Sequence, residues 1–124
     1  MDYQVRARET SGPADEAALK LVGPDGLPLE GLARVLRLLY ATTGLCDESG
    51  EVAGKVKKLV RDSEGVFTPE FRSAIAAELG DVLWYLSDIC TVLELNLADV
   101  AKGNLAKLKD RQDRGVLKGS GDSR

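Results

Sequence analysis

The strongest constraint on the fold is the spacing of apolar residues, which recur at helical intervals along most of the chain. After Thr68-Pro69-Glu70, alternating steps of four and three separate Ile75, Leu79, Val82, Leu86, Ile89 and Leu93. This spacing puts them on one face of a helix, and Thr68 with Pro69 is typical of a helix start. No segment shows the alternation of apolar and polar residues expected of a half-buried strand. The sequence therefore predicts an all-α fold.

Turn-forming glycines and prolines divide the rest of the chain into further helical segments. The expected elements are a short helix over Tyr3 to Thr10, a helix start at Pro13, a long helix from Glu30 to Arg61 and a helix from Asn96 to Gly115. Gly44 is a position where the long helix could bend. The short connector Asp62 to Thr68 predicts that the two central helices are antiparallel neighbours. We expect one domain over residues 1–124, an oligomeric antiparallel helical bundle of four to five helices with a Gly- and Ser-rich tail at 116–124.

Composition excludes several classes of protein. The 124 residues are 44% hydrophobic and 30% charged, which is typical of a globular domain and not of a disordered chain. With 17 Lys+Arg against 20 Asp+Glu the net charge is −3, so nucleic acid is not an expected partner. No apolar run approaches the roughly 20 residues of a membrane span, and no hydrophobic signal core follows Met1. We therefore expect a cytoplasmic protein without a membrane partner.

The absence of histidine limits the chemistry further. It excludes Ser-His and Cys-His nucleophilic catalysis, His-ligated zinc and His-ligated haem. Any metal must then be held by oxygen. The two cysteines, Cys46 and Cys90, form neither a zinc motif nor a Cys-x-x-Cys pair, and both are expected to be reduced and buried.

Two acidic pairs occupy matching places on the two central helices. Glu48 and Glu51 correspond to Glu78 and Asp81 after a shift of thirty positions. Each pair borders the apolar face of its helix, and an antiparallel hairpin would bring the four carboxylates to one level. Four crowded anions need compensating charge, and oxygen ligands favour Mg²⁺ or Mn²⁺. The alternative is a solvated acidic face on which Glu51 pairs with Lys55.

The last expected helix carries a polar-to-basic stripe. Its members follow at steps of three, four and three: Asn104, Lys107, Arg111 and Arg114. Such a stripe can be a solubilising face, but beside an acidic metal site it favours a polyphosphate clamp. One turn after the second acidic pair, Trp84 and Tyr85 could belong to the core or stack on a nucleobase, and Tyr85 lies on the acidic side.

These residues resemble the MazG-like nucleoside triphosphate pyrophosphohydrolases, a family of all-α enzymes. The resemblance is carried by Glu48-Ser49-Gly50-Glu51, by Glu78-Leu79-Gly80-Asp81-Val82-Leu83-Trp84-Tyr85 and by Asn104-Leu105-Ala106-Lys107-Leu108 with Arg111 and Arg114. The opening, with Tyr3-Gln4, is similar to that of small stand-alone members, many of them encoded by bacteriophages. Asp47 departs from the glutamate that many members carry, and residues 11–29 match least.

The resemblance implies hydrolysis of a nucleoside triphosphate between the α and β phosphates, with two or more Mg²⁺ or Mn²⁺ ions. The expected metal ligands are Glu48, Glu51, Glu78 and Asp81, and one of the first two also accepts the proton of the attacking water. The expected phosphate contacts are Lys107, Arg111 and Arg114, followed by Lys55 and Asn104. The expected base pocket contains Tyr3, Gln4 and Tyr85, of which Gln4 could read a base edge.

The substrate expected from this pocket is a purine deoxynucleotide, with dGTP first. A homotetramer built from dimers, or a homodimer, is the expected assembly, located in the host cytoplasm if the chain is phage-encoded. Two other interpretations stay open: a helical oligomerisation module without catalysis, and a nucleotide-binding regulator with negligible turnover.

Overall fold

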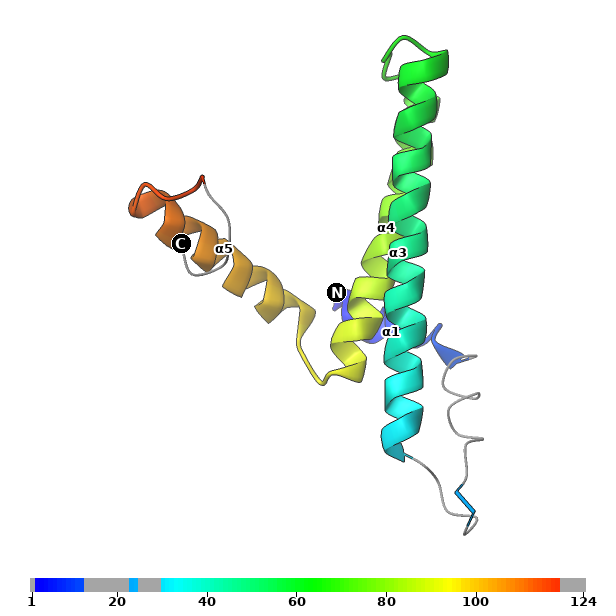
Figure 1. The fold of residues 1–124 in the computed structure, drawn as a ribbon, viewed down its shortest axis with the longest axis vertical. Coiled ribbons are helices and arrows are strands. Elements are labelled where there is room, and N and C mark those ends of the chain that lie inside the picture. The colour runs from blue at the N-terminus through cyan, green and yellow to red at the C-terminus, as the bar shows by residue number, and fades with distance from the viewer. Residues whose placement is uncertain (1, 13–22, 25–29, 119–124) are drawn as a thin grey trace.

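The computed structural model describes residues 2–12, 23–24 and 30–118, which form four helices (Figure 1). They are α1 (Tyr3–Arg8), α3 (Glu30–Asp62), α4 (Pro69–Val92) and α5 (Leu97–Asp113). No strand occurs in the described residues, so the all-α prediction is confirmed. The helix start expected at Pro13 lies outside the described residues.

Helices α3 and α4 form the expected antiparallel hairpin, in which they lie side by side along most of their length (Figure 1). At the start of α4, the Thr68 hydroxyl accepts a hydrogen bond from the Phe71 amide at 3.1 Å, and Pro69 occupies the first turn. This cap agrees with the sequence prediction. The turn before it uses positive φ angles at Glu64 and Gly65, which reverse the chain within a few residues.

Gly44 does not interrupt α3, which is continuous from Glu30 to Asp62. Its role is instead to admit a side chain from the facing helix. A Cβ atom at this position would lie 2.2 Å from two ring carbons of Tyr85. A residue without a side chain is therefore required where the Tyr85 ring crosses α3.

Helix α1 packs against the second half of α4 and is held there by polar contacts. The Gln4 amide donates to the Thr91 hydroxyl at 3.2 Å and to the Leu95 carbonyl at 2.8 Å, and its oxygen accepts from the Leu97 amide at 2.8 Å. Gln4 thus joins α1 to the end of α4 and the start of α5.

A buried carboxylate on α4 binds the segment that follows α1. Asp88 is almost fully buried on α4, and its Oδ1 accepts from Arg37 on α3 at 2.7 Å and from the Ser11 hydroxyl at 3.3 Å. The Trp84 indole also donates to the Thr10 hydroxyl at 2.7 Å. These contacts connect the N-terminal segment to both helices of the hairpin.

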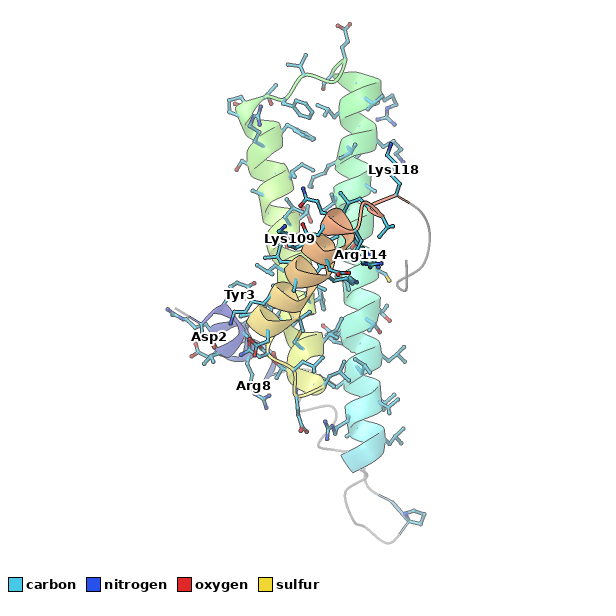
Figure 2. The ribbon with its side chains drawn as sticks, turned by 90° about the vertical axis from the view of Figure 1, so that its left-hand side faces the viewer. Asp2, Tyr3, Arg8, Lys109, Arg114 and Lys118 are labelled. Carbon is cyan, nitrogen blue, oxygen red and sulfur yellow. The ribbon has the colours of Figure 1, made fainter. Side chains whose placement is uncertain are left out.

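Helix α5 begins at the expected cap, where the Asn96 side chain accepts from the Asp99 amide at 3.1 Å. It ends before Gly115, whose φ of 70° favours glycine. Figure 1 shows that α5 leaves the end of α4 and diverges from the hairpin, and Figure 2, seen from that side, places α5 in front of it. Its apolar residues Val100, Leu105 and Leu108 are exposed.

Two sequence expectations concern the thiols and the membrane. Both cysteines are free; Cys90 is buried as predicted, whereas the prediction was wrong for Cys46, which is exposed on α3. The prediction for Cys46 failed because position 46 lies beside the face of α3 that packs against α4, and not within that face. None of the described helices combines the length and the apolar character needed to cross a membrane.

Candidate active site

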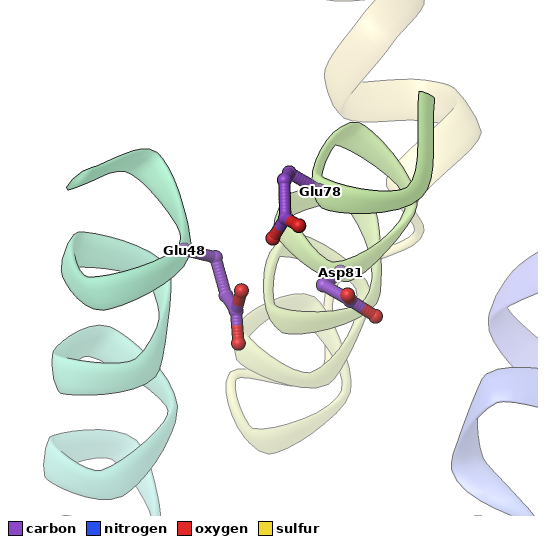
Figure 3. A group of neighbouring side chains, drawn as sticks. All are labelled: Glu48, Glu78 and Asp81. Carbon is purple, nitrogen blue, oxygen red and sulfur yellow. The ribbon is translucent and has the colours of Figure 1, made fainter. Parts of the chain in front are cut away.

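Three carboxylates from the two central helices converge at the middle of the hairpin (Figure 3). Glu48 extends from α3, and Glu78 and Asp81 extend from α4; each offers an oxygen, and these oxygens lie within 4.8 Å of one another. Glu48 and Glu78 are half-buried, and Asp81 is exposed. The antiparallel pairing produces the convergence, because it brings positions equally far from the bend to the same height. We call these three residues the acidic cluster.

Glu51, the fourth expected member, lies close to the acidic cluster but does not belong to its tight group. It is exposed one turn further along α3. Its negative charge still contributes to raising the pKa of Glu48, so Glu48 and Glu51 share one electrostatic environment. The arrangement is therefore a compact group of three with a fourth carboxylate beside it.

The acidic cluster contains more negative charge than its cationic neighbour balances. Burial raises the pKa of Glu48, and the charges of Asp81, Glu51 and Glu78 raise it further. Lys55 Nζ lies 2.9 Å from Glu78 Oε1, and this hydrogen bond raises the pKa of Lys55. The pairing differs from the alternative considered above, in which Lys55 pairs with Glu51. Three converging carboxylates beside one ammonium group suit the binding of a cation.

Lys55 also borders a cavity of about 300 Å³ between the end of α3 and the start of α4. The cavity is lined further by Lys58, Asp62 and Thr68, together with the apolar side chains of Leu59 and Phe71. It lies toward the bend of the hairpin from the acidic cluster, so Lys55 stands between the two.

Tyr85 lies beside the acidic cluster, as its position on the acidic side of α4 predicted. Burial, a hydrogen bond with Tyr40 and the charges of Glu48 and Asp47 raise the pKa of Tyr85 to about 12. Its phenol is consequently protonated at neutral pH and can donate a hydrogen bond. The sequence analysis did not identify Tyr40 as a neighbour of Tyr85. The sequence feature that could have indicated it is its position one turn before Gly44, where the Tyr85 ring crosses α3.

Two expected base-pocket residues lie on α1. Tyr3 is partly exposed there. Gln4 uses both its amide nitrogen and its oxygen in the contacts with Thr91, Leu95 and Leu97 described above. These contacts contradict the expectation that Gln4 reads a base edge, because the donor and the acceptor needed for that purpose already hold the fold together.

The basic stripe of α5 is not brought to the acidic cluster of its own chain. Helix α5 packs against α4 near the junction of the two helices and then diverges (Figure 1). Asn104 and Lys107 are exposed, Arg111 is buried, and Arg114 binds Asp110 with Nη2–Oδ2 at 2.7 Å. Within one chain, α5 therefore does not carry the basic stripe to the acidic cluster, and the role of these residues as phosphate contacts stays a prediction.

The fold and the acidic cluster define a class: an all-α protein with a helical hairpin whose facing carboxylates can hold a divalent cation. The family model of the MazG nucleotide pyrophosphohydrolase domain matches residues 38–116, a range that includes the acidic cluster and the basic stripe. The chain is also 52% identical over 122 residues to the Gene 37 protein of Mycobacterium phage L5. The aligned region covers 98% of this chain and 96% of that protein. No solved structure shows a significant match. The chain belongs to the MazG nucleotide pyrophosphohydrolase family.

Proposed function

We propose that the protein hydrolyses a nucleoside triphosphate between its α and β phosphates, releasing a nucleoside monophosphate and pyrophosphate. The observation that carries this proposal is the convergence of Glu48, Glu78 and Asp81 within the region that matches the family. The chain contains no histidine, and the acidic cluster consists of carboxylates. Hydrolysis by an activated water is therefore the chemistry that the site supports.

The residues of the acidic cluster fit a divalent cation. Three carboxylate oxygens within 4.8 Å of one another form an oxygen-only donor set, which suits Mg²⁺ or Mn²⁺. Glu48, Glu78 and Asp81 would hold the cations, two or more in number, with Glu51 completing the set from one turn away. When bound, such ions offset the charge of the triphosphate and lower the pKa of a coordinated water.

The remaining residues have roles that follow from their positions. Glu48 is the proposed proton acceptor, since burial and its acidic neighbours raise its pKa. Lys55 lies beside Glu78 and can contact a phosphate oxygen with its ammonium group. Lys107, Arg111 and Arg114, with Asn104, stay the proposed polyphosphate contacts on α5, although α5 diverges from the acidic cluster of its own chain and Arg111 is buried. The Tyr85 phenol, whose pKa is raised to about 12, stays protonated and forms a hydrogen bond with Tyr40.

We propose a purine deoxynucleotide as the preferred substrate, with dGTP as the first to assay. The metal and phosphate contacts are the same for every base, so selectivity must come from the side chains that face the base. The rings of Tyr40 and Tyr85, 6.2 Å apart, offer aromatic surface beside the acidic cluster, and a purine stacks over a larger area than a pyrimidine. Gln4 does not support a preference for guanine over adenine, because its side-chain amide binds Thr91, Leu95 and Leu97.

The experiment compares kcat/KM for the canonical ribo- and deoxyribonucleoside triphosphates with Mg²⁺, with Mn²⁺ and with a chelator. The expected result is cation-dependent release of pyrophosphate and the monophosphate. Release of orthophosphate and a diphosphate would show that a different bond is cleaved. Cation-dependent binding without turnover would favour a regulator, and neither binding nor turnover would favour an oligomerisation module.

A further inference from the structure

A second cavity lies toward the other end of α4 from the cavity that Lys55 borders. Its volume is about 290 Å³, and its described lining comes from α1, α3 and the end of α4. Three of the lining residues are arginines, and the full described set is Arg8, Arg34, Arg37, Thr91, Val92 and Glu94. We call this cavity the arginine pocket. Its size is near the lower end of the roughly 300–1,000 Å³ of small-molecule sites, so it suits a small anion.

The arginine pocket is separate from the acidic cluster. Val92 lies eleven residues beyond Asp81 on α4, which corresponds to about 16 Å along the helix axis. Arg8 comes from α1, which packs against α4 (Figure 2). Among the described lining residues there is no proposed metal ligand and no proposed phosphate contact. The catalysis proposed above therefore gives the arginine pocket no role.

The three arginines of the pocket differ in how their charge is balanced. Arg37 is largely buried and pairs with Asp88, so its charge is balanced within the fold. Arg34 Nη2 lies 2.8 Å from Glu94 Oε1, but these side chains are 59% and 77% exposed. In the described part of the chain, no carboxylate pairs with Arg8. Arg8 and Arg34 thus present two positive charges against one exposed carboxylate.

Arg34 is held in place by the end of α4. Its Nη2 atom donates a hydrogen bond to the Val92 carbonyl at 3.0 Å, and the same atom contacts Glu94. A guanidinium group has five N–H donors, so those on Nη1 and Nε remain for another acceptor. Exposed ion pairs contribute little to stability. An anion of higher charge can therefore replace Glu94 beside Arg34.

The backbone at Glu94 indicates that this residue is present for its charge. Its φ of 59° lies in the left-handed region, which glycine adopts readily and glutamate rarely. The conformation belongs to the end of α4, where the Leu95 amide donates to the Cys90 carbonyl at 2.8 Å and the Glu94 amide to the Thr91 carbonyl at 3.1 Å. Glycine is the usual residue at this position. The glutamate instead places a carboxylate on Arg34, where an external anion would bind.

We propose that the arginine pocket binds the linked phosphates of pyrophosphate or of a nucleotide, with one phosphate group on Arg8, the next on Arg34, and Glu94 displaced. Arginine forms forked, charge-assisted hydrogen bonds with phosphate oxygens. Because the two arginines come from α1 and α3, the bound phosphates join these helices. Pyrophosphate is a product of the proposed reaction, but binding in the arginine pocket requires neither cations nor turnover.

Calorimetric titration with sodium pyrophosphate in the presence of EDTA tests this proposal. Without divalent cations the acidic cluster repels the anion, so the titration reports other sites. We expect saturable binding of one pyrophosphate per chain. Arg8→Gln and Arg34→Gln should each raise Kd about 10-fold or more, and both side chains are exposed, so the variants should fold. Glu94→Gln removes the competing charge and should lower Kd by up to about 5-fold.

Two matched controls remove a positive charge elsewhere. Arg6→Gln lies on α1 and Lys107→Ala on α5, both outside the described lining of the arginine pocket. Both should keep the native Kd. Absence of binding to the native chain, or a control variant that weakens binding as much as Arg34→Gln, would overturn the proposal.

The choice of anion tests the linked phosphates and identifies their source. Orthophosphate should bind at least about 10-fold more weakly than pyrophosphate, because it cannot reach both arginines, and equal affinity would contradict the proposal. A deoxynucleoside triphosphate titrated in EDTA identifies a nucleotide site if its Kd is lower than that of pyrophosphate, and a pyrophosphate site if it is not. These titrations need no turnover, so an inactive native chain would count against the proposed function alone.

Discussion

The α3–α4 hairpin contains a buried carboxylate, Asp88, and the acidic cluster, whose member Asp81 lies about two turns before Asp88 on α4. The two sites differ in how their negative charge is balanced. Asp88 is almost fully buried, but Arg37 and Ser11 both donate hydrogen bonds to it. The acidic cluster is less buried, yet in the described part of the chain its three carboxylates have one ion pair, that of Glu78 with Lys55. The negative charge of Asp88 is balanced by Arg37, whereas the three charges of the acidic cluster exceed the one positive charge of Lys55.

This difference separates a structural role from a functional one. A buried carboxylate that has a guanidinium partner holds elements together, and here it fixes α3 and the segment after α1 onto α4. A carboxylate group with excess negative charge costs stability in the free protein, because its members repel one another. Such an arrangement is useful only when a cation binds, which is why we assign catalysis to the acidic cluster and not to Asp88.

The largest expected effect is loss of activity after a change in the acidic cluster. Asp81→Asn should lower kcat by more than about 100-fold, because even residues that only support a metal ligand typically cost 10–100-fold. Pyrophosphate release at saturating Mg²⁺ measures it. Glu70→Gln, on α4 but about three turns away from Asp81, is the matched control and should keep native activity. A near-native kcat for Asp81→Asn would show that Asp81 is not part of the active site.

The second effect concerns stability at the neutralised carboxylate. Asp88→Asn removes the carboxylate charge that faces the largely buried Arg37, and the free energy of unfolding should fall by about 3 kcal/mol. Urea titration measures this change. Replacing both partners, as in Arg37→Met/Asp88→Leu, should restore most of the loss, since neither charge is then left alone. Activity per folded molecule should be retained in both variants, and a loss of activity without a loss of stability would contradict the structural role.

The third effect tests the close packing beside the acidic cluster. Gly44→Ala should destabilise the protein by about 1–3 kcal/mol, because the new methyl group would meet the Tyr85 ring. Gly50→Ala is the matched control: nothing lies within 4 Å of a Cβ there, so it should stabilise α3 by about 0.5–1 kcal/mol. Opposite signs in urea titration support the contact, and equal signs would show that Tyr85 can move aside.

The sequence predicted the elements and the hairpin well because these depend on local signals. Apolar spacing, the Thr68 and Asn96 caps and the short connector are all readable within a few residues, and the hairpin then places Glu48 opposite Glu78 and Asp81. Contacts between distant segments were not readable in the same way. Gln4 joins α1 to residues more than eighty positions away, and Tyr85 lies against Gly44 because two backbones approach closely there.

The direction of α5 could not be predicted for a related reason. Its apolar and basic stripes show that it packs against something, but they do not say against which surface or which chain. The sequence analysis predicted that the stripe lies beside the acidic metal site. The structure shows α5 diverging from its own hairpin.

The smallest expected effect is a gain in stability when one charge of the acidic cluster is removed in the presence of a chelator. Burial and neighbouring carboxylates raise the pKa of Glu48 above its ordinary value of 4.5. The folded state therefore holds this proton more tightly than the unfolded state, and stability decreases as the pH rises through the raised pKa. Glu48→Gln removes that loss, so its Tm at neutral pH should exceed the native value by a small margin.

The pH dependence distinguishes relief of repulsion from a general effect of the substitution. The gain from Glu48→Gln should be absent near pH 4, where the native glutamate is largely protonated, and should appear as the pH rises toward about 7. Added Mg²⁺ should reverse the order, because the native chain then gains more from binding than the variant. Asp88→Asn, the same kind of change at the neutralised carboxylate, should lower Tm with or without Mg²⁺. A loss of stability in both variants at neutral pH without metal would mean that the acidic cluster is balanced by the protein after all.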